Sequence, residues 1–146
     1  RSAVDIPIIA PSEAMLHIAC MLGRRFGLLI YHRNLKPLLQ RIVSRYEMND
    51  RIGGWRSTGF DLPDLASNQD AARENIIRNA RSLVEEDDCD VILPMGVSQC
   101  PLLLDPNILS HEIGVPVVEG VGAPIRLAAM MAELGLHHSR KMWPKE

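Results

Sequence analysis

The stretch Ile6-Pro7-Ile8-Ile9 has a similar counterpart 109 residues later, Val115-Pro116-Val117-Val118, and we call this pair the sequence echo. Each copy leads into a nearly all-apolar segment. Without a gap, six apolar residues that follow the first copy align with six that follow the second: Ala14, Leu16, Ile18, Ala19, Met21 and Leu22 with Ala123, Ile125, Leu127, Ala128, Met130 and Met131. A short buried strand followed by a helix that packs on several sides has this pattern. The echo indicates a duplicated architecture, although two unrelated strand-helix units can also look alike because their composition is common.

Strand and helix signals alternate along the whole chain and are joined by short turns. We expect strands at 5–9, 26–31, within 52–57, at 90–95 and at 115–118. We expect helices at 11–22, 35–49, about 67–85, 106–113 and 123–134, with 60–66 as a connecting loop. Gly23 and Gly114 are placed to end two of these helices. The repeated order predicts an α/β fold, namely a flavodoxin-like parallel sheet with helices on both faces, in a single domain of 146 residues.

The composition argues against several classes of function. The 16 basic side chains nearly balance the 18 acidic ones, and only two Trp, two Tyr and two Phe are present, so nucleic acid is not an expected partner. No apolar run approaches the roughly 20 residues that cross a bilayer, and the start lacks a signal-peptide profile, so we expect a cytoplasmic protein that is not bound to a membrane. Cys20, Cys89 and Cys100 have no metal-ligand spacing, and we expect free thiols and no metal site. The chain begins with Arg1 rather than Met, which leaves open that residues precede it.

Three polar or glycine-bearing segments follow the predicted strands, at the end of the sheet where flavodoxin-like proteins bind ligands. They are Tyr31-His32-Arg33-Asn34, Gly96-Val97-Ser98-Gln99-Cys100 and Glu119-Gly120-Val121-Gly122. The second segment can offer backbone N–H groups, a hydroxyl and an amide to a carboxylate, and Arg33 with His32 could pair with the same group. The two glycines of the third segment allow close approach of the backbone. For each segment, an ordinary loop or a tight packing turn is the alternative.

Four motifs, taken in order, resemble the aspartate/glutamate/hydantoin racemase family. They are Ile6-Pro7-Ile8-Ile9 with Glu13-Ala14-Met15, Leu22-Gly23-Arg24-Arg25-Phe26, Asp90-Val91-Ile92-Leu93 before Gly96, and Val115-Pro116-Val117-Val118-Glu119-Gly120-Val121-Gly122-Ala123. Members of that family consist of two similar α/β halves that face each other across a cleft, and the resemblance implies that this chain is the later half. It also implies a main unit over about 5–114 and a strand-helix segment over 115–146 that packs onto the first half.

The resemblance further implies chemistry without a metal, flavin or pyridoxal cofactor, performed by two cysteines. One thiolate removes a proton from the carbon next to a carboxylate or carbonyl, and the opposing thiol returns a proton to the other face. The family's second cysteine follows a glycine after the strand that reads Val91 to Met95 here, but Val97 occupies that position. Cys100, three residues or about 5 Å further along a helical turn, is the candidate catalytic thiol, and the alternative is a small buried apolar residue.

Two hypotheses about function follow. The first is a cofactor-independent racemase or isomerase that acts on a small carboxylate or cyclic amide, with Gly96, Val97, Ser98, Gln99, Tyr31, His32, Arg33, Asn34, Glu119, Gly120 and Gly122 as substrate-binding residues. The second is a non-catalytic ligand-binding or assembly protein that has lost the thiol at position 97. Under both hypotheses, we expect the protein to form a homo-oligomer or to associate with the missing first half. A third possibility is an unrelated flavodoxin-like domain, but no GxGxxG or Walker pattern supports nucleotide binding.

Overall fold

The computed structural model describes residues 1–60 and 62–145 and contains a parallel sheet of three strands. The strands are β1 (Phe26–Ile30), β2 (Ile52–Ser57) and β3 (Val91–Pro94), and their spatial order is β2-β1-β3. The central strand pairs with both neighbours, so that Leu28 lies opposite Trp55 on one side and Leu93 on the other. The first three strands of a flavodoxin-like sheet have this same spatial order, 2-1-3. The predicted α/β class is confirmed.

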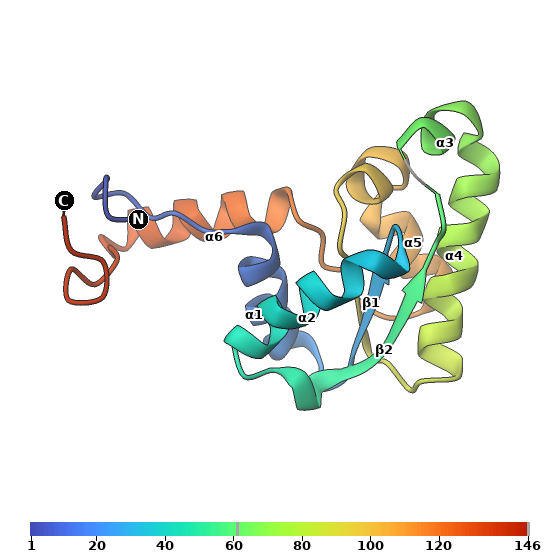
Figure 1. Ribbon diagram of the computed structural model, residues 1–146, viewed down its shortest axis with the longest axis horizontal. Coiled ribbons are helices and arrows are strands. Elements are labelled where there is room, and N and C mark those ends of the chain that lie inside the picture. The colour runs from blue at the N-terminus through green and yellow to red at the C-terminus, as the bar shows by residue number, and fades with distance from the viewer. Residues whose placement is uncertain (61, 146) are drawn as a thin grey trace.

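Helices cover both faces of the sheet (Figure 1). The α-helices are α1 (Pro11–Leu22), α2 (Lys36–Arg45), α3 (Leu62–Ser67), α4 (Gln69–Glu85), α5 (Pro106–Ile113) and α6 (Gly122–Glu133). Two 3-10 turns, η1 (Arg33–Leu35) and η2 (Asn49–Arg51), and an irregular helical segment, η3 (Ser98–Leu103), complete the connections, and Cys100 within η3 is extended with φ −149° and ψ 124°. Gly114 ends α5 as expected, in the left-handed conformation with φ 75° that suits a glycine.

The core consists of two apolar clusters on opposite faces of the central strand. Every residue of β1 and β3 is buried, as is typical of a parallel sheet covered on both sides. Because side chains alternate along a strand, Phe26 and Leu28 pack with α1 and α2, whereas Leu29 packs with α4 and α5. Complete burial of each such side chain stabilises the fold by about 1.5–3 kcal/mol, which holds the strand ends rigidly in place.

The two copies of the sequence echo do not form the strands predicted for them. Residues 5–9 lie outside the three-stranded sheet, bend at Asp5 and Ile6, and pair with no strand in the described ranges. Residues 115–118 contribute one bridge between Val117 and Ile92, and Pro116 in this run has no N–H for a longer ladder. The predictions of strands at 5–9 and 115–118 are therefore wrong, whereas the helices that follow, α1 and α6, form and contact each other.

Two predicted boundaries also differ from the structure. The helix expected to reach residue 49 ends at Arg45, because Glu47 adopts a positive φ of 57° that breaks the α-helical path. The loop expected at 60–66 contains α3, and position 61 lies outside the described residues.

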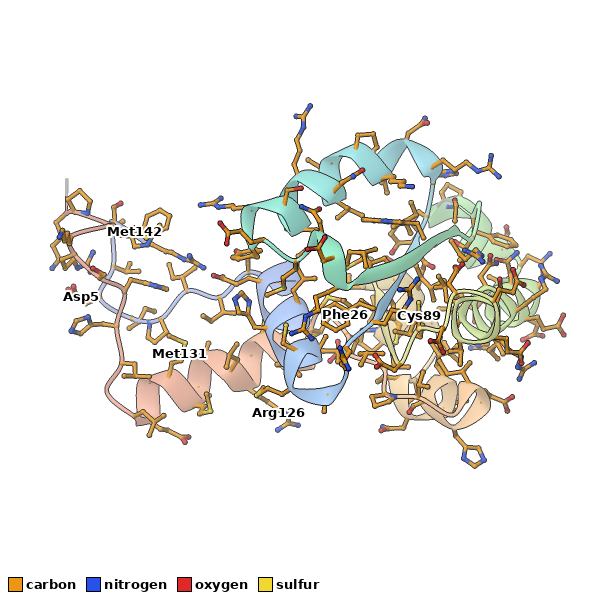
Figure 2. All side chains as sticks on the ribbon, turned by 90° about the horizontal axis from the view of Figure 1, so that it is seen from below. Asp5, Phe26, Cys89, Arg126, Met131 and Met142 are labelled. Atoms are coloured by element: carbon orange, nitrogen blue, oxygen red, sulfur yellow. The ribbon has the colours of Figure 1, made fainter. Side chains whose placement is uncertain are left out.

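Residues 1–10 and 122–145 form an arm that projects from the body (Figure 1). The Arg140 guanidinium donates to the carbonyl groups of Arg1, Ser2 and Val4 and pairs with Asp5. The backbone N–H of Ile8 donates to the His138 ring at 2.8 Å. Figure 2 places Asp5, Met131 and Met142 on this arm, away from the core residue Phe26. These bonds join the two terminal segments along α6, and the assignment of 5–114 and 115–146 to separate units stays a prediction.

Candidate functional site

The structure brings together the first two of the three predicted segments. The Tyr31 hydroxyl, just after β1, accepts a hydrogen bond from the backbone N–H of Ser98 at 3.0 Å. The Tyr31 ring lies so close to Gly96 that a Cβ added at position 96 would overlap it, and only glycine fits there. The end of β1 therefore fixes the loop that follows β3.

The third segment reaches the same loop. A Cβ built on Gly120 would lie 3.7 Å from Cγ1 of Val97, which places the Val97 side chain beside Gly120. The Glu119 carboxylate accepts hydrogen bonds from the N–H groups of Val121 at 2.6 Å and Gly122 at 2.7 Å, at the start of α6. This carboxylate thus stabilises the positive end of the helix and orients the turn.

Backbone donors remain unused in this loop cluster. Within 1–60 and 62–145, the N–H groups of Val97 and Gly120 donate to no acceptor. Val97 itself is 39% exposed. Gly120 is buried, so the exposed turn at Val97, with its free N–H group, is the part of the cluster suited to hold a carbonyl or carboxylate oxygen.

The Cys100 thiol is directed into the interior. Its side chain is fully buried, and burial raises the pKa of the thiol to about 12, with the negative charges of Glu119 and Asp105 as further causes. A thiol of this pKa stays protonated at neutral pH. Its position resembles the predicted alternative, a small apolar packing residue, more closely than an exposed nucleophile.

The Gln99 amide is buried without hydrogen-bond partners in the described part of the chain. The side chain is completely buried, and neither its amide oxygen nor its amide nitrogen has a hydrogen-bond partner among the described residues. Leaving such a group without a partner costs about 1–3 kcal/mol. The predicted role of Gln99, an amide that binds substrate directly, requires a rearrangement that would expose it.

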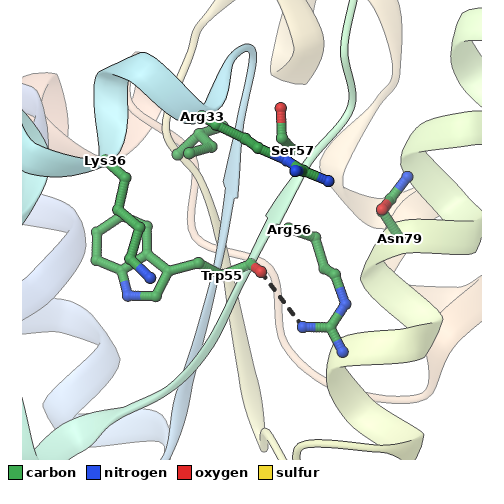
Figure 3. A pocket seen from close by; sticks show the side chains of 7 residues that line it. Arg33, Lys36, Trp55, Arg56, Ser57 and Asn79 are labelled. Atoms are coloured by element: carbon green, nitrogen blue, oxygen red, sulfur yellow. Dashed lines mark hydrogen bonds between the residues drawn. The ribbon is translucent and has the colours of Figure 1, made fainter.

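The remaining predicted residues do not all meet at the loop cluster. His32 and Asn34 are exposed beside η1. Arg33 lines a separate pocket with Lys36, Trp55 and Arg56, shown in Figure 3, and no residue of 96–100 lines that pocket. Arg33 and Ser98 therefore lie in different sites, although each follows a strand of the same sheet.

The sequence patterns gave no sign of two contacts. The Tyr31–Ser98 hydrogen bond joins residues 67 positions apart, and nothing in the spacing indicates it. The pocket lined by Trp55 was not predicted either, because it joins residues of β2 to Arg33 and Lys36, which follow β1.

In the part of the chain that the structure describes, no group of three or more His, Cys, Asp or Glu side chains is placed to hold a metal ion. None of the described helices combines the length and apolar character needed to span a bilayer.

The strand order, the buried sheet and the loops gathered at its carboxyl edge define an α/β protein of flavodoxin-like topology. The sequence profile of the Asp/Glu/hydantoin racemase family matches residues 1–128, and the chain belongs to this family. The resemblance deduced from the motifs is thereby confirmed.

Individual relatives agree with this assignment. The chain is 29% identical over 140 residues to a hydantoin racemase from Pseudomonas sp. (strain NS671), covering 96% of the chain and 55% of that protein. It is 23% identical over 141 residues to a hydantoin racemase from Paenarthrobacter aurescens, covering 96% of the chain and 58% of that protein. The chain thus spans little more than half the length of these relatives.

A solved structure supports the same conclusion. The crystal structure of allantoin racemase from Pseudomonas fluorescens superimposes with a TM-score of 0.90 at 25% identity, over 99% of this chain and 61% of that one. Allantoin racemase from Klebsiella pneumoniae, at 21% identity and a TM-score of 0.83 over 99% of this chain and 59% of that one, shares the fold.

Proposed function

We propose that the protein to which this chain belongs is a cofactor-independent racemase that acts on a small cyclic amide of the hydantoin type or on a related carboxylate. The observation that carries the proposal is the meeting of Gly96–Ser98 with Tyr31 and Gly120 at the carboxyl edge of the sheet. Family membership and the likeness to hydantoin and allantoin racemases support this choice of substrate class.

This chain supplies the wall of the site that binds and orients the substrate. The free and exposed N–H group of Val97 is the donor for a carbonyl or carboxylate oxygen next to the reacting carbon. Electron density that moves onto this oxygen when the neighbouring carbon loses its proton is stabilised by such a donor. Tyr31 holds the loop that presents it.

The group that moves the proton comes from outside this wall. Val97 has no ionisable group, and the Cys100 thiol is buried and protonated. Inversion needs a base on one face of the carbon and an acid on the other. We assign both of these roles to the part of the protein that completes its length, since this chain covers 55% of the hydantoin racemase it matches.

An apolar surface on the arm is suited to contact that part. A groove of about 450 Å³ lies between residues 7–11 and α6, with Ile8, Val121 and Ile125 along it. Ile125 is 65% exposed, and an apolar face of this kind is typical of an interface. The missing part covers this groove, and Ile125→Glu in the intact protein is expected to weaken the association, measured as a lower melting temperature than that of Arg126→Glu on the same helix.

Proton exchange in heavy water tests the proposed reaction. The intact protein is incubated with 5-substituted hydantoins, allantoin and amino acids, and replacement of hydrogen by deuterium at the reacting carbon is followed by NMR. We expect exchange with a cyclic amide that persists in Cys100→Ala, because that thiol packs in the interior. Exchange that disappears in Cys100→Ala, with an unchanged melting temperature, would contradict the assignment of the acid and base.

Val97 also favours a second function, a non-catalytic ligand-binding or assembly protein of the same fold. A valine at this position cannot transfer a proton, and the loop around it keeps its donors. This alternative predicts that no tested compound exchanges deuterium, whereas a cyclic amide still raises the melting temperature. Val97→Cys separates the two cases further, since a gain of exchange would show that only the thiol is lacking.

A further inference from the structure

A pocket of about 380 Å³ lies at the carboxyl end of the edge strand β2, apart from the loop cluster described above. Figure 3 shows that Lys36 and Trp55 form one side and that Arg56 and Asn79 form the other, with Arg33 and Ser57 between them. No residue of 96–100 or 119–122 lines it. The volume is in the range of small-molecule sites and exceeds what a single inorganic ion fills.

The secondary structure explains why basic groups gather here. Arg33 belongs to η1 and Lys36 begins α2, so both follow the end of β1. Trp55 and Arg56 are consecutive in β2 and therefore face opposite sides of the sheet edge. The pocket straddles that open edge, where no further strand among the described residues covers β2.

One of the three cations is already neutralised. Arg56 pairs with Asp87 at 2.6 Å and with Glu86 at 3.3 Å, and it donates to the Ser82 hydroxyl at 3.0 Å. This guanidinium is held against α4 and is not free to bind a ligand.

The other two cations are uncompensated. Across residues 1–60 and 62–145, neither Arg33 nor Lys36 forms an ion pair with a carboxylate. The Lys36 ammonium lies 5.7 Å from the centroid of the Trp55 ring, which orders it in a cation–π contact. The first turn of α2 adds the positive end of a ten-residue helix.

The neutral polar groups of the pocket act as fixed walls. The Ser57 hydroxyl donates to the Tyr31 carbonyl at 2.8 Å, and the Asn79 amide donates to the Asn75 carbonyl at 2.9 Å. Two free positive charges, a rigid polar wall and an aromatic surface match a molecule with two negative charges and a small organic body.

We infer that the pocket formed by Arg33, Lys36 and Trp55 binds a small organic dianion, either a dicarboxylate or a phosphate monoester. Arg33 contacts one end of the ligand through its planar guanidinium, Lys36 attracts the second charge, and the body of the ligand packs beside Trp55. This binding is independent of the proposed racemisation, because the pocket shares no residue with Gly96–Ser98 or Gly120.

Trp55 provides a local signal for the test. The chain has two tryptophans, so Trp143→Phe in the intact protein leaves Trp55 as the reporter in this chain. This protein is titrated with succinate and, separately, with glycerol 3-phosphate, at constant ionic strength, and acetate serves as the monoanion control. We expect a saturable change in the chain's Trp55 emission, confirmed by calorimetry, with one or both dianions and not with acetate.

Substitutions identify the site. Arg33→Gln and Lys36→Gln are each expected to weaken dianion binding about tenfold, since each removes one charge-assisted contact. Arg41→Gln removes an exposed charge elsewhere on α2 and is expected to change the affinity less than twofold. Melting curves of all three proteins check that they are folded. The inference is overturned if neither dianion gives saturable binding, or if Arg41→Gln weakens binding as much as Arg33→Gln does.

Discussion

The Cys100 thiol gives the sharpest test of whether this wall can transfer a proton. It is 0% exposed, and its pKa is raised from 9.0 to about 12 because burial, with Glu119 and Asp105 nearby, disfavours the thiolate. A difference of three pKa units corresponds to about 4 kcal/mol between the two protonation states. At pH 8 the thiolate fraction falls from about 0.1 for the ordinary thiol to about 0.0001, a factor of roughly 1,000.

Alkylation tests this factor together with the accessibility of the thiol. The protein is treated with iodoacetamide at pH 8, with and without urea, and the peptide that contains Cys100 is quantified by mass spectrometry over time. We expect alkylation of Cys100 in the folded protein to be at least about 1,000-fold slower than in urea, because both access and thiolate formation are suppressed. Val97→Cys is the matched control, since position 97 is 39% exposed and its thiol should react within about tenfold of the unfolded rate.

A folded-state rate for Cys100 within tenfold of the rate in urea would refute the reasoning. The thiol would then be accessible and ionisable, and the loop after β3 would have to open readily. The proposed assignment of proton transfer to another part of the protein would lose its main support.

Three further outcomes are expected. Gly96→Ala should lower the free energy of unfolding by about 1–3 kcal/mol in urea titrations, because the added Cβ overlaps the Tyr31 ring, and Tyr31→Ala in the same chain should recover part of the loss. Burial raises the thiol pKa values of Cys89 to about 11 and of Cys100 to about 12, so their contribution to stability is complete below pH 9 and is lost as pH rises from 9 toward 12. The urea midpoint should therefore fall less steeply between pH 9 and 12 in the double variant Cys89→Ala/Cys100→Ala than in the unchanged protein. Equal slopes in the two proteins would contradict this. Arg140→Ala should speed hydrogen exchange of the Ile8 N–H, which is bonded to His138 on the same arm, at least tenfold while the sheet stays protected, and unchanged exchange would show that the bonds of Arg140 do not hold the arm.

Local sequence signals predicted most helices well. The fourth predicted helix, at 106–113, forms with those bounds because Asp105 accepts a hydrogen bond from the Asn107 N–H and Gly114 takes the left-handed conformation. Each of these signals acts within one or two turns of the chain. The apolar runs of β1 and β3 were equally informative, since a buried parallel strand needs no distant polar partner.

The failures have a common physical cause. Residues 5–9 have a strand-like composition, but a strand needs a neighbour with free N–H and C=O groups, and composition does not say whether one is present. The site shows the same limit. The order of strands correctly placed Tyr31 and Gly96 at one edge, whereas the burial of Cys100 and the placement of Arg33 in a separate pocket depend on packing between distant segments.

The bonds of Arg140 to residues 1–5 bring the beginning and the end of the chain to one spot. A short peptide linker could therefore bridge residues 145 and 1, and new termini could be opened in an exposed turn such as the one at Glu47. Such a circular permutant would keep every strand pairing of the sheet. It would also convert a junction held by hydrogen bonds and ion pairs into a covalent one.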